Sequence, residues 1–261
     1  METEHIVKSF DEELLKLDNL VVEMGGLAES QLADAIAALV RRDIELAGRV
    51  VEQDKRIDAI ENEIHGFVLR LLATRQPVAV DLRIILASLK ISSSLERIGD
   101  YAKNIAKRTT TIAKVPAMGG TAQSIARMTG VVQGMIKNVL DAYIGRDVDM
   151  AADVRARDEE VDQMHTSLFR ELLTYMMEDP RNITPATHLL FTAKNVERIG
   201  DHVTGIAEQI HFMVAGELPG DLRPKGDNTS YTVVEVASPL NAGSRNDGSP
   251  NDRPPNDGSK P

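Results

Sequence analysis

The pentapeptide Glu-Arg-Ile-Gly-Asp occurs twice in this chain, at Glu96–Asp100 and at Glu197–Asp201. Each copy carries two carboxylates four residues apart, a spacing that places both side chains on one face of a helix. A second pair with the same spacing precedes each copy, in Asp54–Asp58 and in Asp158–Asp162. The chain therefore holds two acid-x-x-x-acid pairs in each half. Carboxylate oxygens are the ligands that hard metal ions prefer, so this duplication suggests a duplicated metal site.

The positions of the prolines indicate that the two acidic pairs of each half meet. In the first half the pairs are centred on residues 56 and 98, and the midpoint is Pro77. In the second half the centres are residues 160 and 199, and the midpoint falls at Asp179-Pro180. A proline ends a helix, and two antiparallel helices joined there bring positions equally far from the turn to the same height. We therefore expect four carboxylates at one level in each half.

Four close carboxylates repel one another, and a bound cation removes this cost. All-oxygen ligands suit Mg²⁺, Mn²⁺, Ca²⁺ or iron, and the nearby His165 in the second half extends the choice toward iron, manganese or zinc. At about 100° per residue, the carboxylates fall beside the apolar stripe of each helix, so we expect them on the outer flank of the bundle. The predicted metal ligands are Asp54, Asp58, Glu96, Asp100, Asp158, Asp162, Glu197 and Asp201.

Apolar residues recur at helical spacing through most of the chain, and strand-type alternation is absent. The pattern predicts six helices, over residues 10–40, 43–74, 80–112, 121–145, 150–178 and 185–215, with Gly216 as the C-terminal stop of the last one. Lys114–Thr121 contains Pro116, Gly119 and Gly120 and reads as a linker between two similar halves. The prediction is an all-α fold of two tandem three-helix bundles related by internal duplication, over residues 1–115 and 121–216.

The composition changes beyond residue 216. Pro, Gly, Asn, Asp and Ser dominate residues 217–261, and such a segment buries too little apolar surface to offset its ordering entropy. We expect a polar, disordered tail. Its single apolar stretch, Tyr231–Val236, has no sheet to join.

The overall composition excludes several classes of protein. The 261-residue chain has a formal net charge of −10 and no clustered basic stripe, so we expect no nucleic-acid binding. It has no cysteine, which excludes disulfides and thiolate metal sites. The acidic N-terminus does not read as a signal peptide. Charges interrupt every apolar stretch, so no segment is expected to span a membrane. These features are compatible with a cytoplasmic protein.

Two longer segments, Leu95–Ala106 and Val196–Glu208, resemble the paired signatures of the PhoU family, the regulators of phosphate-specific transport and phosphate signalling. Gln76–Arg83 and Met24–Leu27 are similar to the family as well, and the resemblance extends over roughly residues 5–216. Two departures stand out. Gly205 takes the place that Asn104 has in the first signature, and the second half has no counterpart of Asp81–Arg83.

The resemblance implies a fold and a function. Family members are two three-helix bundles in tandem, bind metal ions through the acid-x-x-x-acid pairs, are mostly dimeric and are not known as enzymes. They act at the cytoplasmic side of the phosphate transporter and reach the membrane only through partners. They hold down phosphate uptake and the phosphate-starvation response by contact with the transporter's ATPase subunit and with a sensor histidine kinase.

Two other functions remain open from the residues alone. A carboxylate-bridged metal enzyme in a helix bundle requires inward-facing Glu-x-x-His pairs on two helices. Asp162–His165 is the nearest match, and its first-half equivalent ends in Glu61. A metal-free helical adaptor would instead use its acids to meet basic patches on partner proteins. Metal analysis of protein prepared without chelator separates the adaptor from a metal-binding regulator.

Overall fold

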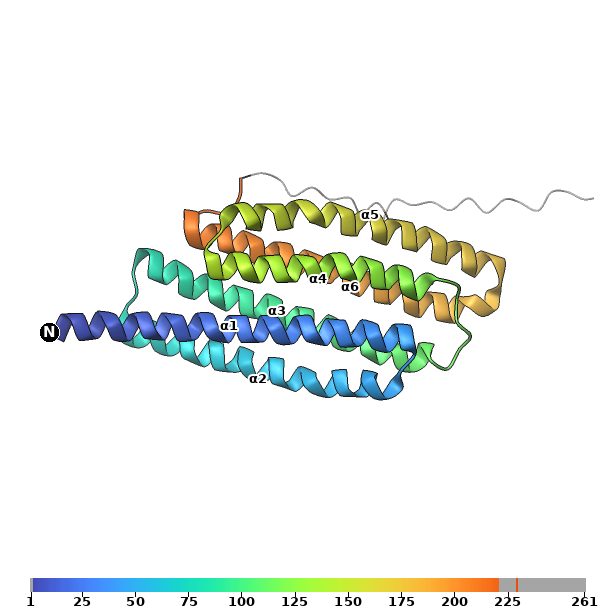
Figure 1. Ribbon diagram of the computed structural model, residues 1–261, viewed down its shortest axis with the longest axis horizontal. Coiled ribbons are helices and arrows are strands. Elements are labelled where there is room, and N and C mark those ends of the chain that lie inside the picture. Colours follow the sequence, from blue (N-terminus) through green and yellow to red (C-terminus); the bar gives the residue numbers. More distant parts are fainter. Residues whose placement is uncertain (1, 221–228, 230–261) are drawn as a thin grey trace, which may run out of the picture. The chain divides into compact units, whose positions relative to one another are not determined.

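The computed structural model describes residues 2–220 and Thr229, and this part of the chain contains helices and no strand. The elements are α1 (Glu2–Arg41), α2 (Ile44–Arg75), α3 (Ala79–Ile112), α4 (Thr121–Gly145), α5 (Val148–Glu178), the short 3₁₀ helix η1 (Pro180–Asn182) and α6 (Ile183–Ala215) (Figure 1). All six predicted α-helices are confirmed. Most of the predicted tail, including Tyr231–Val236, lies outside the described residues.

The helix ends repeat between the two halves because the same residue types cap them. The side chain of Asp43 accepts a hydrogen bond from the Leu46 amide at 2.9 Å and begins α2, and Asp147 does the same for α5 with the Met150 amide at 2.9 Å. Such caps satisfy amides that the first helical turn leaves without a partner. Gly216 ends α6 in the left-handed region, with φ 88°, as glycine does readily.

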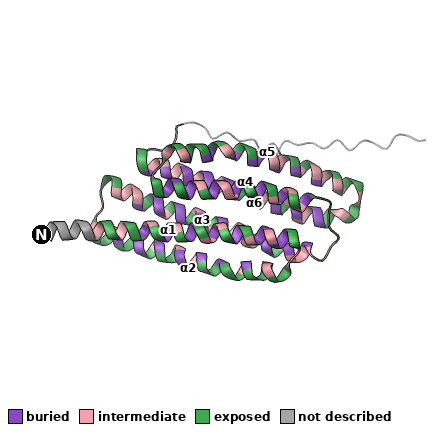
Figure 2. Ribbon diagram, viewed as in Figure 1, coloured by how far each residue is buried: buried purple, intermediate pink, exposed green. Residues whose placement is uncertain are grey.

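The six helices lie within one compact unit, Met1–Ser230. Helices α1–α3 form one three-helix bundle and α4–α6 form the other, as the duplication predicts. The two bundles pack through α3 against α6 and α1 against α4, while α2 and α5 lie on opposite outer sides (Figure 1). Buried residues follow the sides of the helices that face their neighbours (Figure 2). The boundaries 1–115 and 121–216 stay a prediction.

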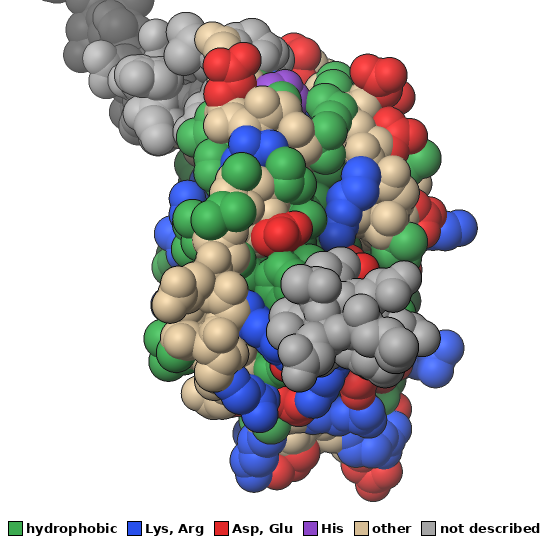
Figure 3. Space-filling model, turned by 90° about the vertical axis from the view of Figure 1, so that its left-hand side faces the viewer, with side chains coloured by type: hydrophobic (Ala, Val, Ile, Leu, Met, Phe, Trp, Pro, Cys, Tyr) green, Lys and Arg blue, Asp and Glu red, His purple; other side chains and the backbone are tan. Residues whose placement is uncertain are grey.

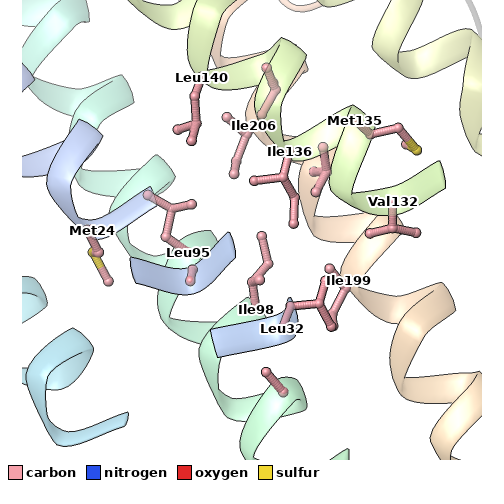
Figure 4. Close-up of a cluster of buried hydrophobic side chains, with 14 of the residues drawn as sticks. Met24, Leu32, Leu95, Ile98, Val132, Met135, Ile136, Leu140, Ile199 and Ile206 are labelled. Atoms are coloured by element: carbon pink, nitrogen blue, oxygen red, sulfur yellow. The ribbon is translucent and has the colours of Figure 1, made fainter. Parts of the chain in front are cut away.

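The core is continuous from one bundle into the other. Leu32 and Ile98 of the first bundle and Val132, Ile136 and Ile199 of the second are fully buried in one cluster (Figure 4). Each of these side chains contributes about 1.5–3 kcal/mol by leaving water. The interface between the bundles is therefore stabilised in the same way as the interior of each bundle.

Helices α3 and α6 run antiparallel. The rings of Tyr101 and His202 lie 5.7 Å apart, whereas Arg108, further along α3, contacts His188, which precedes His202 on α6. This arrangement brings the two copies of the repeated pentapeptide to the same level, and Figure 4 shows their central residues, Ile98 and Ile199, on facing helices. The duplication in the sequence is therefore a pseudo-twofold relationship at the centre of the structure.

Polar contacts also join the bundles. The Tyr143 hydroxyl donates to Asp18 Oδ1 at 2.6 Å and lies 2.8 Å from the Ser88 hydroxyl, so α4 is tied to α1 and α3. Arg146 Nη2 bonds Asp18 Oδ2 at 2.6 Å. Close packing accompanies these bonds, because a Cβ on Gly25 would collide with the side chain of Leu140. The Gly25-Gly26 pair therefore serves the contact of α1 with α4 through its first residue alone.

Candidate functional site

The first carboxylate cluster joins α2 to α3. Lys103 Nζ bonds Asp54 Oδ2 of α2 and lies 2.6 Å from Asp100 Oδ1 of α3. The other oxygen of Asp54 accepts a hydrogen bond from Gln31 Nε2 of α1 at 3.2 Å. Glu96 is tied to Asp100 through Arg97, which contacts both carboxylates. Asp58 completes the cluster; burial raises its pKa, and the nearby charges of Asp54 and Asp100 raise it further. The structure therefore brings together all four predicted ligands of the first half.

The second cluster joins α5 to α6 at the corresponding level. Asp158 of α5 reaches the backbone of α6 at Gly200, and the negative charges of Asp162 and Asp201 raise the pKa of Glu197. Lys194 Nζ lies 2.8 Å from Glu197 Oε1. Glu197 Oε2 is buried and has no hydrogen-bond partner within the described part of the chain. The predicted ligands Asp158, Asp162, Glu197 and Asp201 thus lie at one level of α5 and α6.

The glycine of each repeated pentapeptide leaves room for an aspartate from the preceding helix. A Cβ on Gly200 would lie 3.2 Å from Asp158 Oδ1, and a Cβ on Gly99 would lie 3.5 Å from Asp54 Oδ1. On Gly99 the added carbon would also come within 2.9 Å of Ile57 Cδ1. A side chain at position 200 would therefore crowd the carboxylate of Asp158, whereas one at position 99 would touch Asp54 and crowd Ile57. The two glycines therefore help to shape the carboxylate clusters by keeping the helices close together.

Burial and mutual repulsion shift the protonation of the two glutamates. Burial, together with the charge of Asp100, raises the pKa of Glu96 to about 7. Burial, with the charge of Asp201 as a further cause, raises the pKa of Glu197 to about 6 against the opposing effect of Lys194. Burial likewise raises the pKa of Asp58. Burial also acts to raise the pKa of Asp100, but the hydrogen bond and charge of Lys103 lower it below its usual value.

The expectation that all eight carboxylates lie on an outer flank is wrong for half of them. Four are buried: Asp54 at 4% exposure, Asp158 at 1%, Asp162 at 4% and Glu197 at 5%. The spacing of the acids places them relative to the core stripe of their own helix alone. Helix α3, however, packs against α1, α2 and α6, and α6 against α3, α4 and α5. A residue at the edge of one helix–helix interface is therefore buried in the interface with a third helix. The glycines leave the space that the aspartates occupy there.

The donors fit a hard cation by their chemistry. Carboxylates from two helices meet in each cluster, and a buried oxygen of Glu197 lacks a partner among the described residues. Within residues 2–220 and Thr229, no group of three or more histidine, aspartate or glutamate side chains has the geometry of a metal site. His165 is buried at 2% exposure, beside the second cluster in the sequence. Binding of an ion therefore requires the side chains to turn toward it.

Two polar residues of the first cluster, Lys103 and Gln31, were not predicted as site residues from the sequence. Lys103 follows Asp100 by three residues, the spacing of neighbours on one helix face, and this spacing was the available signal. Gln31 interrupts an apolar stripe of α1 that includes Met24, Ala28 and Ala35. A polar residue at a core position of a helix signals a buried hydrogen bond.

A family model decides the identity of these two bundles. The model described as "PhoU domain" matches residues 21–109 and 125–210, one match in each bundle. The chain belongs to the PhoU family. Both clusters lie within the matched ranges. PhoU proteins are accessory and regulatory proteins, so the chain is not an enzyme. The alternative of a carboxylate-bridged metal enzyme is not supported.

Relatives with known names support this assignment. A protein named "Phosphate-specific transport system accessory protein PhoU homolog" from Caulobacter vibrioides is 56% identical over 225 residues, which cover 86% of this chain and 98% of the relative. The protein of the same name from Rhizobium meliloti is 50% identical over 226 residues, which cover 87% of this chain and 95% of the relative.

The described part of this chain contains no helix long and apolar enough to cross a membrane.

Solved structures of PhoU proteins share the fold. PhoU from Pseudomonas aeruginosa superposes with a TM-score of 0.77 at 38% identity, covering 80% of this chain and 100% of that chain. The phosphate transport system regulatory protein PhoU from Streptococcus pneumoniae gives a TM-score of 0.75 at 28% identity, covering 82% and 100%. The fold of two tandem three-helix bundles is therefore that of the PhoU family.

Proposed function

We propose that this chain is an accessory regulator of a phosphate-specific transport system, which restrains phosphate uptake and the phosphate-starvation response when phosphate is plentiful. The observation that carries this proposal is the match of the PhoU model to both bundles, together with relatives named as accessory proteins of that system at up to 56% identity. The regulator acts by protein–protein contact in the cytoplasm, with the transporter's ATPase subunit and a sensor histidine kinase as partners. It meets the membrane only through them.

Exposed apolar side chains offer surfaces for such contacts. Val78 is 73% exposed and Val80 is 51% exposed, directly after the turn between α2 and α3. On the end of the molecule shown in Figure 3, hydrophobic, acidic and basic side chains are interspersed. A mixed surface of this kind is typical of contacts between proteins that also exist apart.

We propose that the chain is a homodimer, for which light scattering should give twice the 28.6 kDa mass of the chain.

A direct binding experiment tests the function. The purified full chain is presented to the transporter's ATPase subunit and to the cytoplasmic part of the sensor kinase from the same organism, and binding is followed by interferometry. We expect both partners to bind with Kd values at or below about 10 μM, as specific regulatory contacts do. Absence of binding to both partners contradicts the proposal.

We further propose that both clusters bind metal ions, as the family resemblance implies. When bound, a Mg²⁺, Mn²⁺, iron or zinc ion would supply positive charge among carboxylates that otherwise repel one another. The first-cluster ligands would be Asp54, Asp58, Glu96 and Asp100, and the second-cluster ligands would be Asp158, Asp162, Glu197 and Asp201. The raised pKa values of Glu96 and Glu197 support this proposal, because they mark carboxylates held where a cation would stabilise their charge.

Elemental analysis tests the metal proposal and separates it from a metal-free adaptor. Protein purified without chelator should contain metal, and the double variant Glu96→Ala with Glu197→Ala should lose it. Glu159→Ala, an exposed acid on α5, serves as the control and should keep it. Equal metal content in the double variant and the control removes the assignment of the ligands. Metal-free protein that still binds both partners favours the adaptor.

A further inference from the structure

Lys103 occupies the centre of the first carboxylate cluster. Its ammonium group bonds Asp54 of α2 and Asp100 of α3, so a single positive charge links the two acidic pairs of the bundle. Only 21% of the side chain is exposed, and that of Asp54 is 5% exposed. Burial disfavours the ammonium, but its two carboxylate partners more than offset this effect and raise its pKa. The lysine is therefore positively charged at neutral pH.

The internal repeat shows that this lysine is specific to the first bundle. The two pentapeptides are 101 residues apart, so the counterpart of Lys103 is Thr204. The Thr204 hydroxyl donates to the backbone carbonyl of Asp201 at 2.8 Å. The second cluster places its lysine elsewhere, because Lys194 bonds Glu197 and its counterpart in the first bundle is Ser93. The two clusters are thus duplicated in their acids, but their lysines stand at different positions.

Gln31 makes the first cluster more specialised still. Its amide nitrogen bonds both Asp54 and the Val50 carbonyl, while its own oxygen, in a residue only 2% exposed, lacks a hydrogen-bond partner among the described residues. That oxygen lies 3.3 Å from the point where a Cβ on Gly99 would stand. By the spacing of the caps Asp43 and Asp147, which are 104 residues apart, the counterpart of Gln31 is Met135. A buried amide oxygen beside a carboxylate, without a hydrogen-bond partner, is a suitable ligand for a cation.

We propose that Lys103 is a built-in cation of the first cluster, which a divalent metal ion displaces when it binds Asp54 and Asp100. The inference rests on the metal binding proposed above and adds its regulation. An ion entering the cluster competes with a charge that the chain itself supplies at the same carboxylate oxygens. Two positive charges so close repel each other, and the ammonium swings out on its flexible stem toward solvent.

The test is a titration of Mn²⁺ into chelator-treated full-length protein by isothermal calorimetry. To observe the first cluster alone, all proteins carry Glu197→Ala. Lys103→Thr copies the residue of the second bundle, Lys103→Arg keeps the charge, and Lys90→Thr removes an exposed lysine from the same helix. We expect Lys103→Thr to bind Mn²⁺ more tightly than its parent by on the order of tenfold or more. Lys90→Thr should bind within about threefold of the parent. Lys103→Arg, which keeps a positive charge, should show no gain in affinity over the parent.

The outcomes separate this inference from the metal proposal. If the parent binds Mn²⁺ and Lys103→Thr binds it no more tightly, the role of Lys103 is overturned while metal binding stands. If neither protein binds Mn²⁺, the metal proposal falls and the competition falls with it. Thermal unfolding gives a second readout, in which Mn²⁺ should raise the Tm of Lys103→Thr more than that of the parent. Should Lys103→Thr fail to fold, Lys103→Met, which keeps the apolar stem, is titrated in its place.

Discussion

Gly200 lies so close to Asp158 that a Cβ added to the glycine would stand 3.2 Å from the carboxylate oxygen Oδ1. The same relationship joins Gly99 to Asp54 in the first bundle, at 3.5 Å. Two glycines of one repeated motif thus accommodate two aspartates of the preceding helices. The repeat encodes a contact between helices, and the carboxylates of the motif are only one side of that contact.

This relationship predicts opposite effects of alanine at different helical glycines. Gly99→Ala should lower the free energy of unfolding by about 1–3 kcal/mol, because the new methyl group would stand 2.9 Å from Ile57 Cδ1 and 3.3 Å from Gln31 Oε1, two buried side chains that would have to shift within the core. Gly66→Ala, on α2 with open space around it, should raise the free energy of unfolding by up to about 1 kcal/mol through helix propensity. Urea unfolding of both variants measures the difference. A stabilised Gly99→Ala would contradict the crowded geometry.

The sequence predicted the helices well because apolar periodicity and helix breakers are local. The helix over residues 121–145 matches α4 at both ends, and Pro77 and Gly216 lie where helices end. Periodicity within a helix does not reveal which neighbours the helix has. For this reason the burial of Asp158 and Glu197 was missed: their positions are on a flank of one helix pair and inside the contact of another.

Individual polar partners were equally invisible to the pattern. Lys103 reads as one of many lysines on an acidic protein, and its bond to Asp54 joins residues 49 apart in the chain. The Tyr143–Asp18 bond joins residues 125 apart. Contacts of such separation depend on how the helices pack within a bundle or how the two bundles pack together, which no single helix encodes. Gln31 at a core position was a local sign of a buried polar contact.

The tie between the bundles should be measurable at Tyr143. Tyr143→Phe keeps the buried ring under Arg146 but removes the hydroxyl that donates to Asp18 and meets Ser88. We expect the free energy of unfolding to fall by about 1–3 kcal/mol, because the fully buried Ser88 loses its hydroxyl partner and the partly buried Asp18 loses one partner while it keeps Arg146. Tyr175→Phe, at a partly buried tyrosine of α5, is the control and should change stability by less than about 0.5 kcal/mol. Equal effects in the two variants would show that the Asp18 contact contributes nothing.

Removal of Asp54 should be more costly than removal of an exposed acid. Asp54→Ala leaves the partly buried ammonium of Lys103 with one carboxylate fewer. It also removes one of the two acceptors of the buried Gln31 amide, which keeps the Val50 carbonyl. We expect a loss of about 2–4 kcal/mol in unfolding free energy. Glu159→Ala should cost less than about 0.5 kcal/mol. Chemical denaturation of chelator-treated protein checks both, and a loss below about 1 kcal/mol for Asp54→Ala would contradict its structural role.

The glutamates predict a dependence of stability on pH in chelator-treated protein. The pKa values of Glu96 and Glu197 are raised to about 7 and about 6, above the usual 4.5. Folding therefore favours their protonated forms. This contribution to stability is fully present below pH 4.5 and is lost as pH rises through 6 and 7. We expect the free energy of unfolding to fall by roughly 2 kcal/mol between pH 5 and pH 8.

The matched variant for this prediction replaces both glutamates by glutamine. Glu96→Gln with Glu197→Gln keeps the size of the side chains and removes their titration, so the fall in stability between pH 5 and pH 8 should largely disappear. Addition of Mn²⁺ at pH 8 should restore stability to the unsubstituted protein and less so to the variant. An unchanged pH dependence in the variant would assign the fall to other groups.

The central claim, that the chain restrains the phosphate-starvation response, is tested most directly in its own host with the gene deleted. Expression of a phosphate-starvation reporter is measured in phosphate-rich medium, with the deletion complemented by the unsubstituted gene or by the double variant Glu96→Ala with Glu197→Ala. We expect high reporter expression in the deletion strain and repression by the unsubstituted gene. We expect weaker repression by the double variant at equal protein level. A deletion strain whose reporter stays repressed in phosphate-rich medium would contradict the claim.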